Sequence, residues 1–486
     1  MLRRPHALLF GLGLAFVLLA GLIMSHFGLP DRSIVAVLTP AILMIPFAAG
    51  LRAANSSLLP FFTDERGATA AQNSYALGTI VFGLGLILTL SIGLSGALPA
   101  LAAGSMIGLC LNAFVFAPAL RRSEGFSVLQ WLEMHFDNSA LRVILRASLF
   151  ATTSLVVLAG METTTQAIVT AFGLSRLMAL AASAFVAGIL TLSGGVATVL
   201  TVLGSSWIIV LAAMVLPLLL QGYEMPPELT PGAGGGGLWL GQNLQYGLVA
   251  ALGVASLPVT LVPAIASARP KEACQSVTRL LVSLVAASVV VWMLLGTPAA
   301  FGQVDLSAGS RLLGGFLGPI SALQPASESL AAASSLLVPL GLTIVALHVL
   351  AANLLEGTPR QTPEFPPLSG IRLARMRLWA VVALAIAGAI LTRYVFDAGL
   401  LLLWALGIAA VFLAPAMVIA SARCGRASFA LAGSYLAVLA VVGIYWVFDH
   451  GFASQHSIIA LFCYGALAAT SVGVILALKS DRAAKG

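Results

Sequence analysis

The sequence has 486 residues, of which 60% are hydrophobic and 8% are charged, and its mean hydropathy is +1.04. This composition excludes a soluble globular protein, which carries about a quarter of its residues as charges. A net charge of +7 is compatible with a polyanionic partner. The basic residues, however, cluster in gaps between apolar segments, which indicates a membrane protein with no nucleic-acid partner.

Apolar segments long enough to cross a bilayer follow one another along the chain. A helix of about 20 apolar residues spans the hydrocarbon core, and it satisfies its own backbone hydrogen bonds there. The sequence therefore predicts an all-α, polytopic membrane protein of about fourteen transmembrane helices. The predicted spans are 7–27, 33–52, 73–96, 98–120, 141–171, 176–193, 195–220, 244–267, 275–299, 329–355, 377–395, 397–422, 427–447 and 456–478.

The basic residues also predict the orientation of these spans. All but four of the 24 Lys and Arg lie in or beside alternate gaps, and the exceptions are Arg32, Arg176, Arg311 and Arg393. By the positive-inside rule, both termini are predicted to be cytoplasmic, with the basic segments against anionic membrane lipid. No small-residue cleavage site precedes Pro30, so we expect a retained first helix. This feature and the short loops are typical of a bacterial inner (plasma) membrane protein.

No motif of the sequence indicates enzyme chemistry. A P-loop, a GxSxG elbow with partner residues, an HExxH helix and a dinucleotide fingerprint are all missing. The cysteines lack CxxC spacing and a paired histidine, which indicates free thiols or small apolar residues. They are Cys110, Cys274, Cys424 and Cys463. We therefore expect no enzyme activity, no catalytic residue and no protein-bound metal centre.

Glu162 lies in the middle of a predicted span, in the run Met161-Glu162-Thr163-Thr164-Thr165-Gln166. An ionisable group at that depth is costly unless it faces water or a partner. Two interpretations carry similar weight. Glu162 is a substrate, cation or proton site, or it is a structural carboxyl hydrogen-bonded to neighbouring hydroxyl groups.

A later span, 329–355, carries two further polar groups. His348 and Asn353 lie five residues apart, and a helix-packing role is favoured because such side chains commonly bond across membrane helices. Ala331, Ser334 and Ser335 place small hydroxyls on one face of a helical turn. Hydroxyl and carbonyl oxygens suit a hard cation such as sodium, and the alternative is close packing of small residues.

Glycine and proline interrupt two of the spans at corresponding positions. Gly93-Leu94-Ser95-Gly96 ends at Pro99 in the third span, and Gly253 to Pro258 interrupts the eighth. These spans begin two groups of five, which is compatible with an inverted repeat. Broken helices expose carbonyls and helix ends that bind ion and substrate near the midplane. The alternative is that Gly and Pro are simply common in membrane helices.

Short motifs spread over about residues 60–360 resemble those of the sodium:solute symporter family. Gly93-Leu94-Ser95-Gly96 is similar to the family's G-I-S-G, and Lys271-Glu272-Ala273 with Ser276-Val277 is similar to K-E-A-x-x-S-V. Other matching segments are 62–66, 73–76, 117–133, 172–174, 194–198 and 257–258. The nearest resemblance is to the cation/acetate and other monocarboxylate permeases, of which this chain would be a divergent member.

The resemblance implies a LeuT-type 5+5 inverted-repeat core with flanking helices, and sodium-coupled uptake by alternating access. Two N-terminal flanking helices would occupy 1–60, and two C-terminal flanking helices with a short cytoplasmic tail would occupy 426–486. The core would occupy 61–425, with repeat one at about 73–220 and repeat two at about 244–422.

The resemblance also implies site residues and a coupling ion, with no other cofactor. Sodium would be ligated by Ala331, Ser334 and Ser335, with backbone carbonyls from within 84–93. The substrate-binding residues, on the third core helix and at the second break, would be Gly160, Glu162, Thr163, Gln166 and Ser256.

The sequence departs from the family pattern where charge and oxygen ligands are expected. The Asp and Ser-rich run of the first core helix is replaced by apolar residues 80–90, and the His after Leu-Pro is Val259. The coupling ion is therefore sodium, or a proton with Glu162 as the coupling group. The function we expect is cation-coupled symport of a small organic solute such as a monocarboxylate. The alternative is a non-transporting, symporter-like membrane protein that acts as a sensor or as the subunit of a membrane or signalling partner.

Overall fold

The computed structural model describes residues 4–53, 67–89, 97–123, 127–220, 240–300, 324–356, 370–422, 427–449 and 455–485. In these ranges the regular elements are helices, with one isolated parallel β-bridge between Ala68 and Ser267, so the predicted all-α fold is confirmed. The helices in chain order are α1 Arg4–His26, α2 Asp31–Arg52, α4 Ala70–Thr89, α5 Leu98–Leu111, η3 Asn112–Phe116, α6 Ala117–Arg122, α7 Val128–His135, α8 Ser139–Phe172, α9 Arg176–Leu220, α10 Leu240–Ser256, α11 Pro258–Ala266, α12 Pro270–Ala300, α14 Gln324–Glu356, α15 Gly370–Arg393, α16 Ala398–Ile408, η6 Ala409–Leu413, α17 Ala414–Ser421, α18 Ala427–Asp449 and α19 Gln455–Lys485.

Within the described ranges, 11 helical stretches are long and apolar enough to cross a membrane, by length and composition. One of them, Arg176–Ala213, has 38 residues, and as a straight helix it would be ~57 Å long, well beyond the bilayer core. Gly195 breaks α9 with φ 62° and ψ −148°, a conformation that is essentially restricted to glycine. The break falls at the predicted boundary between spans 176–193 and 195–220. The total of about fourteen spans stays a prediction.

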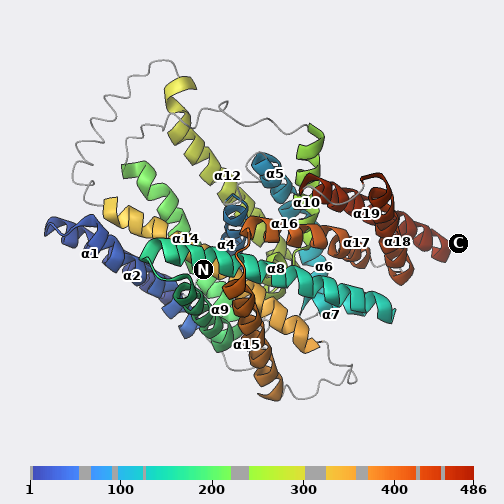
Figure 1. The fold of residues 1–486 in the computed structure, drawn as a ribbon, viewed down its shortest axis with the longest axis horizontal. Coiled ribbons are helices and arrows are strands. Elements are labelled where there is room, and N and C mark those ends of the chain that lie inside the picture. The colour runs from blue at the N-terminus through green and yellow to red at the C-terminus, as the bar shows by residue number, and fades with distance from the viewer. Residues whose placement is uncertain are drawn as a thin grey trace.

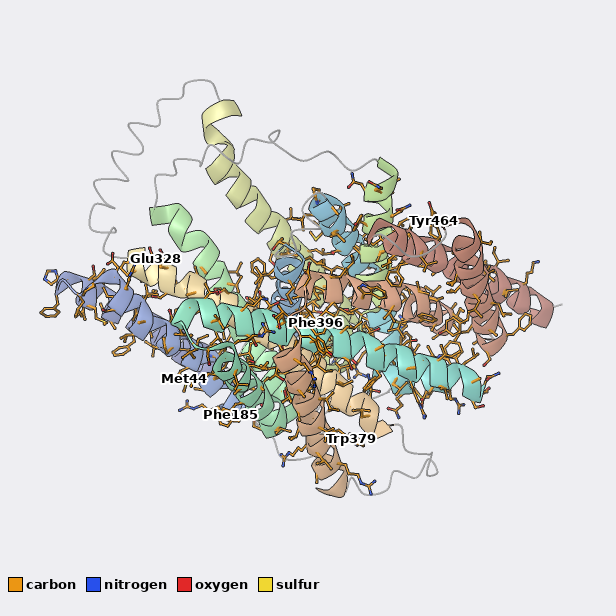
Figure 2. All side chains as sticks on the ribbon, viewed as in Figure 1. Met44, Phe185, Glu328, Trp379, Phe396 and Tyr464 are labelled. Carbon is orange, nitrogen blue, oxygen red and sulfur yellow. The ribbon has the colours of Figure 1, made fainter. Side chains whose placement is uncertain are left out.

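The outer helices present apolar side chains on their exposed faces. Figure 1 shows α1 and α2 at one edge of the bundle and α18 and α19 at the opposite edge. Met44, Phe185, Trp379 and Tyr464, labelled at the periphery in Figure 2, are all exposed. Large apolar groups on so many faces suit contact with lipid chains, and this supports an integral membrane protein.

Glycines allow several helices in the centre of the bundle to approach closely. A Cβ on Gly104 of α5 would lie 2.0 Å from the carbonyl oxygen of Gly247 in α10. A Cβ on Gly253 of α10 would lie 2.6 Å from the carbonyl oxygen of Leu406 in α16. Close backbone contact through small residues is the usual way that membrane helices associate. It fixes α10 between α5 and α16.

Candidate functional site

The eighth predicted span is broken in the structure, as its sequence predicts. Leu257 is extended, with φ −64° and ψ 122°, and it separates α10 from α11. Pro258 explains the break, because proline disfavours the helical conformation of the preceding residue and is well tolerated in the first turn of the next helix. The corresponding interruption at 93–96 lies outside the described residues.

Hydroxyl groups donate to carbonyl oxygens at and beside the break. Thr260 Oγ1 donates toward the carbonyl oxygens of Val254, at 3.0 Å, and Leu257, at 2.8 Å. Ser256 Oγ lies 2.7 Å from Leu252 O and 3.0 Å from Ala409 O. The last carbonyls of a helix need such partners when they are buried. Ser256 is therefore placed at the break, as expected, but its visible contacts are structural.

Two π-helical turns hold the break from two sides. η3 carries Asn112, whose Nδ2 donates to Thr260 Oγ1 over 3.2 Å, and η6 begins at Ala409, which accepts from Ser256. Each π-turn is followed within two residues by a proline, Pro118 or Pro415. Proline lacks a backbone N–H, so a local change of hydrogen-bond register is expected before it, and π-turns often mark functional sites. Sequence analysis did not identify these turns.

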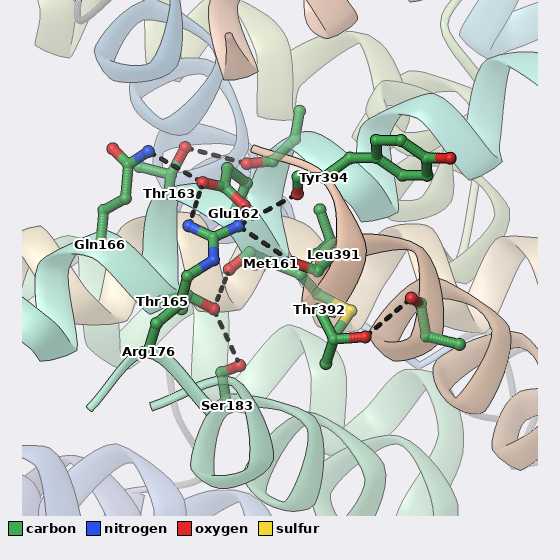
Figure 3. A network of polar contacts seen from close by, with 12 residues as sticks. Met161, Glu162, Thr163, Thr165, Gln166, Arg176, Ser183, Leu391, Thr392 and Tyr394 are labelled. Carbon is green, nitrogen blue, oxygen red and sulfur yellow. Dashed lines mark hydrogen bonds and ion pairs between the residues drawn. The ribbon is translucent and has the colours of Figure 1, made fainter. Parts of the chain in front are cut away.

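Glu162 has a dedicated partner in the structure (Figure 3). The carboxylate is fully buried, and Arg176 binds both of its oxygens, with Nη1 2.8 Å from Oε1 and Nη2 2.6 Å from Oε2. Gln166 Nε2 donates to Oε1 over 2.9 Å. Arg176 Nη2 also contacts the carbonyl oxygens of Leu391 and Tyr394 at the end of α15. A bidentate pair of this kind is a strong, directional contact.

This network joins α8 to the first residue of α9 and to the end of α15. It favours the structural interpretation of Glu162, because the negative charge is already compensated by an arginine. The partner is a guanidinium and not the hydroxyl groups that the sequence suggested. Arg176 was one of the four exceptions to the charge distribution, and that exception was the signal that could have revealed the pair.

The other predicted substrate residues of α8 do not converge on one cavity. Gly160 faces α14, where an added Cβ would lie 2.4 Å from Thr343 Oγ1 and 3.0 Å from the carbonyl oxygen of Pro339. Thr163 Oγ1 donates to the carbonyl oxygen of its own helix at Ala159, over 2.9 Å. Glu162 and Gln166 instead face Arg176. A shared substrate site from these residues stays a prediction.

The predicted sodium ligands lie in the first half of α14. Ser334 is buried, Ser335 is half-buried and Ala331 is exposed. Both hydroxyls donate to α14 carbonyls, from Ser334 to Leu330 over 2.8 Å and from Ser335 to Ala332 over 2.7 Å. Each oxygen keeps a lone pair that could face a cation.

The helix predicted to complete the sodium site lies against α14. A Cβ on Gly83 of α4 would lie 3.4 Å from the carbonyl oxygen of Val338. Hydroxyl and carbonyl oxygens are the donors that a hard cation prefers, and the sodium site on α14 stays a prediction. Of the predicted carbonyl donors, 84–89 belong to α4 and 90–93 lie outside the described residues.

A small cavity lies between α11 and the second half of α14. Its volume of about 20 Å³ is enough for about one water molecule. Asn353 is buried, with 8% of its surface exposed. Neither its amide oxygen nor its amide nitrogen has a hydrogen-bond partner within the described ranges. The cavity is lined by Ser127, Val128, Val196, Pro258, Val262, Ile265, His348, Val349, Ala352 and Asn353. His348 and Asn353, predicted to have packing roles, thus meet at this cavity.

Comparison with known proteins identifies the fold. No protein-family model and no curated protein matches the sequence. Among solved structures, the chain is similar to a Na⁺-coupled sialic acid symporter in a substrate-bound outward-open state, with a TM-score of 0.58 and 14% identity over 90% of this chain and 97% of that one. It also aligns with Mhp1 in an inward-facing conformation, at 14% identity over 90% of each chain, but that TM-score of 0.35 is too low to support an argument.

These findings define the class of the protein. The chain is an integral membrane protein with a LeuT-type fold, as predicted from its sequence motifs. At 14% identity the likeness shows the fold alone. The resemblance to the cation/acetate permease branch stays a prediction.

Proposed function

We propose that this protein is a secondary active transporter that couples a cation gradient to symport of a small organic solute by alternating access. The observation that carries the proposal is the fold shared with a Na⁺-coupled symporter over 90% of the chain. The break between α10 and α11 supports it, because transporters of this architecture place ion and solute at discontinuous helices. The solute we propose is a monocarboxylate, as in the permeases that the sequence motifs resemble.

Sodium is favoured over the proton as the coupling ion. Glu162, the predicted proton-coupling group, has both carboxylate oxygens bound by Arg176. Ser334 and Ser335, with the backbone of Ala331, would hold sodium through oxygen atoms on α14. A bound sodium ion there supplies positive charge, which lets its gradient bias the packing of α14 against α4.

In this proposal the protein resides in a bacterial inner membrane with both termini in the cytoplasm. The alternation of basic segments supports that orientation. Its partners would be the transported solute and membrane lipid.

A second candidate function is favoured by two specific observations. The central carboxylate is neutralised, and the cavity beside α11 has room for about one water molecule. Such a core suits a symporter-like protein that no longer transports and serves as a sensor or partner subunit.

Uptake into proteoliposomes separates the two candidates. Labelled acetate, pyruvate and propionate would be offered under an imposed sodium gradient and then under a proton gradient. We expect sodium-driven accumulation that falls at least about tenfold in the Ser334→Ala/Ser335→Ala variant, because two cation ligands are lost. Ser329→Ala is the matched control, because Ser329 is buried in the same helix and bonds its own backbone in the same way.

Each other outcome changes the proposal in a defined way. Proton-driven uptake that Glu162→Gln abolishes would return the coupling role to Glu162. No accumulation of any of the three solutes under either gradient would contradict the monocarboxylate proposal and favour the second candidate.

A further inference from the structure

Three buried asparagines surround the short helix α11. Asn112 donates to Thr260 Oγ1 near its start, and Asn73 donates to Ser267 Oγ at its end over 2.9 Å. Asn353 lines the cavity along its side. Their exposed fractions are 0% for Asn73, 1% for Asn112 and 8% for Asn353. Across the part of the chain that the structure describes, the amide oxygen of each one has no hydrogen-bond partner.

Such a concentration of unsatisfied groups is unusual in a folded protein. Leaving a buried donor or acceptor without a partner is costly, and native structures keep few of them. A cavity with polar walls and room for about one water molecule lies in the same place. Asn353 therefore offers unpartnered polar atoms to water in the cavity that it lines.

Arg121 holds the far end of α11 in place. Its Nε donates to the carbonyl oxygen of Ser267 over 2.6 Å, and its Nη2 donates to that of Ala268 over 2.8 Å. The carbonyls at a helix C-terminus carry partial negative charge, and a planar guanidinium can bind two of them at once. The N–H of Ala68 adds a hydrogen bond to the carbonyl oxygen of Ala266 over 3.3 Å. Two segments distant in sequence, at Ala68 and at Arg121, thus meet at residues 266–268.

All these contacts are of a kind that can be exchanged. A hydrogen bond to a carbonyl can be replaced by one to water at a modest net cost, which is larger when one partner is charged. Interlocked backbones, as between α5 and α10, have no such substitute. Residues 266–268 are therefore the part of the broken helix whose hydrogen bonds water can replace.

We propose that residues 266–268 form a gate, that Arg121 is its latch, and that release of the latch admits water to the cavity at Asn353. The gate lies on the side of the membrane predicted to be cytoplasmic. It rests on the proposed function only in that it would form the inner end of the transport pathway. Arg121 is a positioning residue here, because it acts through backbone carbonyls and touches no solute.

The test measures access of water-soluble reagent to Asn353. In the full-length chain with its four cysteines replaced, Asn353→Cys is labelled by a membrane-impermeant maleimide in inside-out vesicles. We expect Arg121→Gln to raise the labelling rate at position 353 by about tenfold or more, because two charge-assisted hydrogen bonds are lost. Arg121→Lys keeps the charge but loses the planar group that binds two carbonyl oxygens at once, so we expect a smaller increase in the labelling rate at position 353.

Two controls separate a gate from a loosened fold. Arg122→Gln removes the neighbouring charge, which is exposed, and should leave the rate at position 353 unchanged. Ser205→Cys reports on a fully buried position of α9, and it should stay unlabelled in every background.

The outcomes are decisive in both directions. An unchanged rate at position 353 in Arg121→Gln overturns the latch, as does equal labelling of the Ser205→Cys reporter. Labelling only from right-side-out vesicles overturns the cytoplasmic placement of the gate. Since no solute or ion gradient is used, the gate and the transport function can fail separately.

Discussion

The two halves of the broken helix are fixed in different ways. α10 is held by backbone contact, since an added Cβ would lie 2.0 Å from a neighbouring carbonyl oxygen at the Gly104–Gly247 crossing and 2.5 Å at the Gly108–Ala251 crossing. α11 is buried along its whole length, and polar contacts hold its ends in addition, from Asn112 at the start and Arg121 at the finish. The proposed gate implies that the α10 half of the span stays fixed while the end of α11 is released.

The energetics follow from the range of each interaction. Van der Waals contact between backbones is lost after a shift of about 1 Å, and lipid offers no better partner for the freed surface. A hydrogen bond to water replaces a hydrogen bond to protein with little net change. We therefore expect substitutions on the α10 side to lower stability and those on the α11 side to change access.

The largest expected effect concerns the ion pair between Glu162 and Arg176. It tests whether a buried polar contact of this protein can be lost without a large cost in stability. Arg176→Gln would leave the carboxylate of Glu162 buried without a counter-charge, so we expect a loss of about 3–5 kcal/mol in the free energy of unfolding. The measurement is thermal or denaturant unfolding in detergent. Arg393→Gln, at an exposed position, is the control.

The double variant Glu162→Gln/Arg176→Gln should recover much of that loss, because neither remaining side chain is charged. A stability of Arg176→Gln equal to that of the parent would mean that Glu162 is protonated or hydrated. The carboxyl would then again be a candidate for proton coupling.

The next effect concerns the fixed half. Gly104→Ala places one methyl group against the backbone of Gly247, so α5 and α10 must separate, and we expect a loss of about 1–3 kcal/mol. Gly85→Ala is the matched control, since a Cβ there meets nothing within 4 Å. It should be neutral or slightly stabilising, as alanine favours helix. Equal unfolding temperatures of the two variants would remove the distinction between the halves.

The smallest effect concerns the junction itself. Thr260→Val keeps the side-chain shape but removes the hydroxyl that serves Val254, Leu257 and Asn112, so we expect a loss of about 1–2 kcal/mol. Thr278→Val, which removes an exposed hydroxyl bonded within α12, should cost less than half as much. If Thr260→Val left the free energy of unfolding unchanged, water would already donate hydrogen bonds to the carbonyl oxygens at the break.

Local chemistry made parts of this fold predictable. Pro258 forces the residue before it out of the helical conformation, and Gly195 permits a turn that other residues avoid, so both breaks are visible in sequence. The all-α fold follows equally from composition. Ser256 could be placed at the break for the same reason, but its bond to Ala409 depends on how α10 and η6 pack.

The contacts between helices could not be predicted, because they depend on tertiary packing. Glu162 and Arg176 are separated by the end of one helix and the start of the next, so their meeting depends on how α8 and α9 are arranged. Gly160 and Glu162 are two residues apart on one helix, so helical spacing already places them on different faces of α8, and only the partner of each face was hidden. The contact of Arg121 with residues 267–268 spans about 146 positions, and no local pattern encodes it.

The π-turn η3 also sets the angular phase of the chain that follows it. A π-turn inserts one residue into a helix, and each residue of an α-helix turns the chain by about 100°. If the same residues formed a regular α-helix with no π-turn, the extra residue would swing Arg121 about a quarter-turn away from the carbonyl oxygens it binds. The direction of that guanidinium therefore depends on the wider turn that lies about two turns upstream.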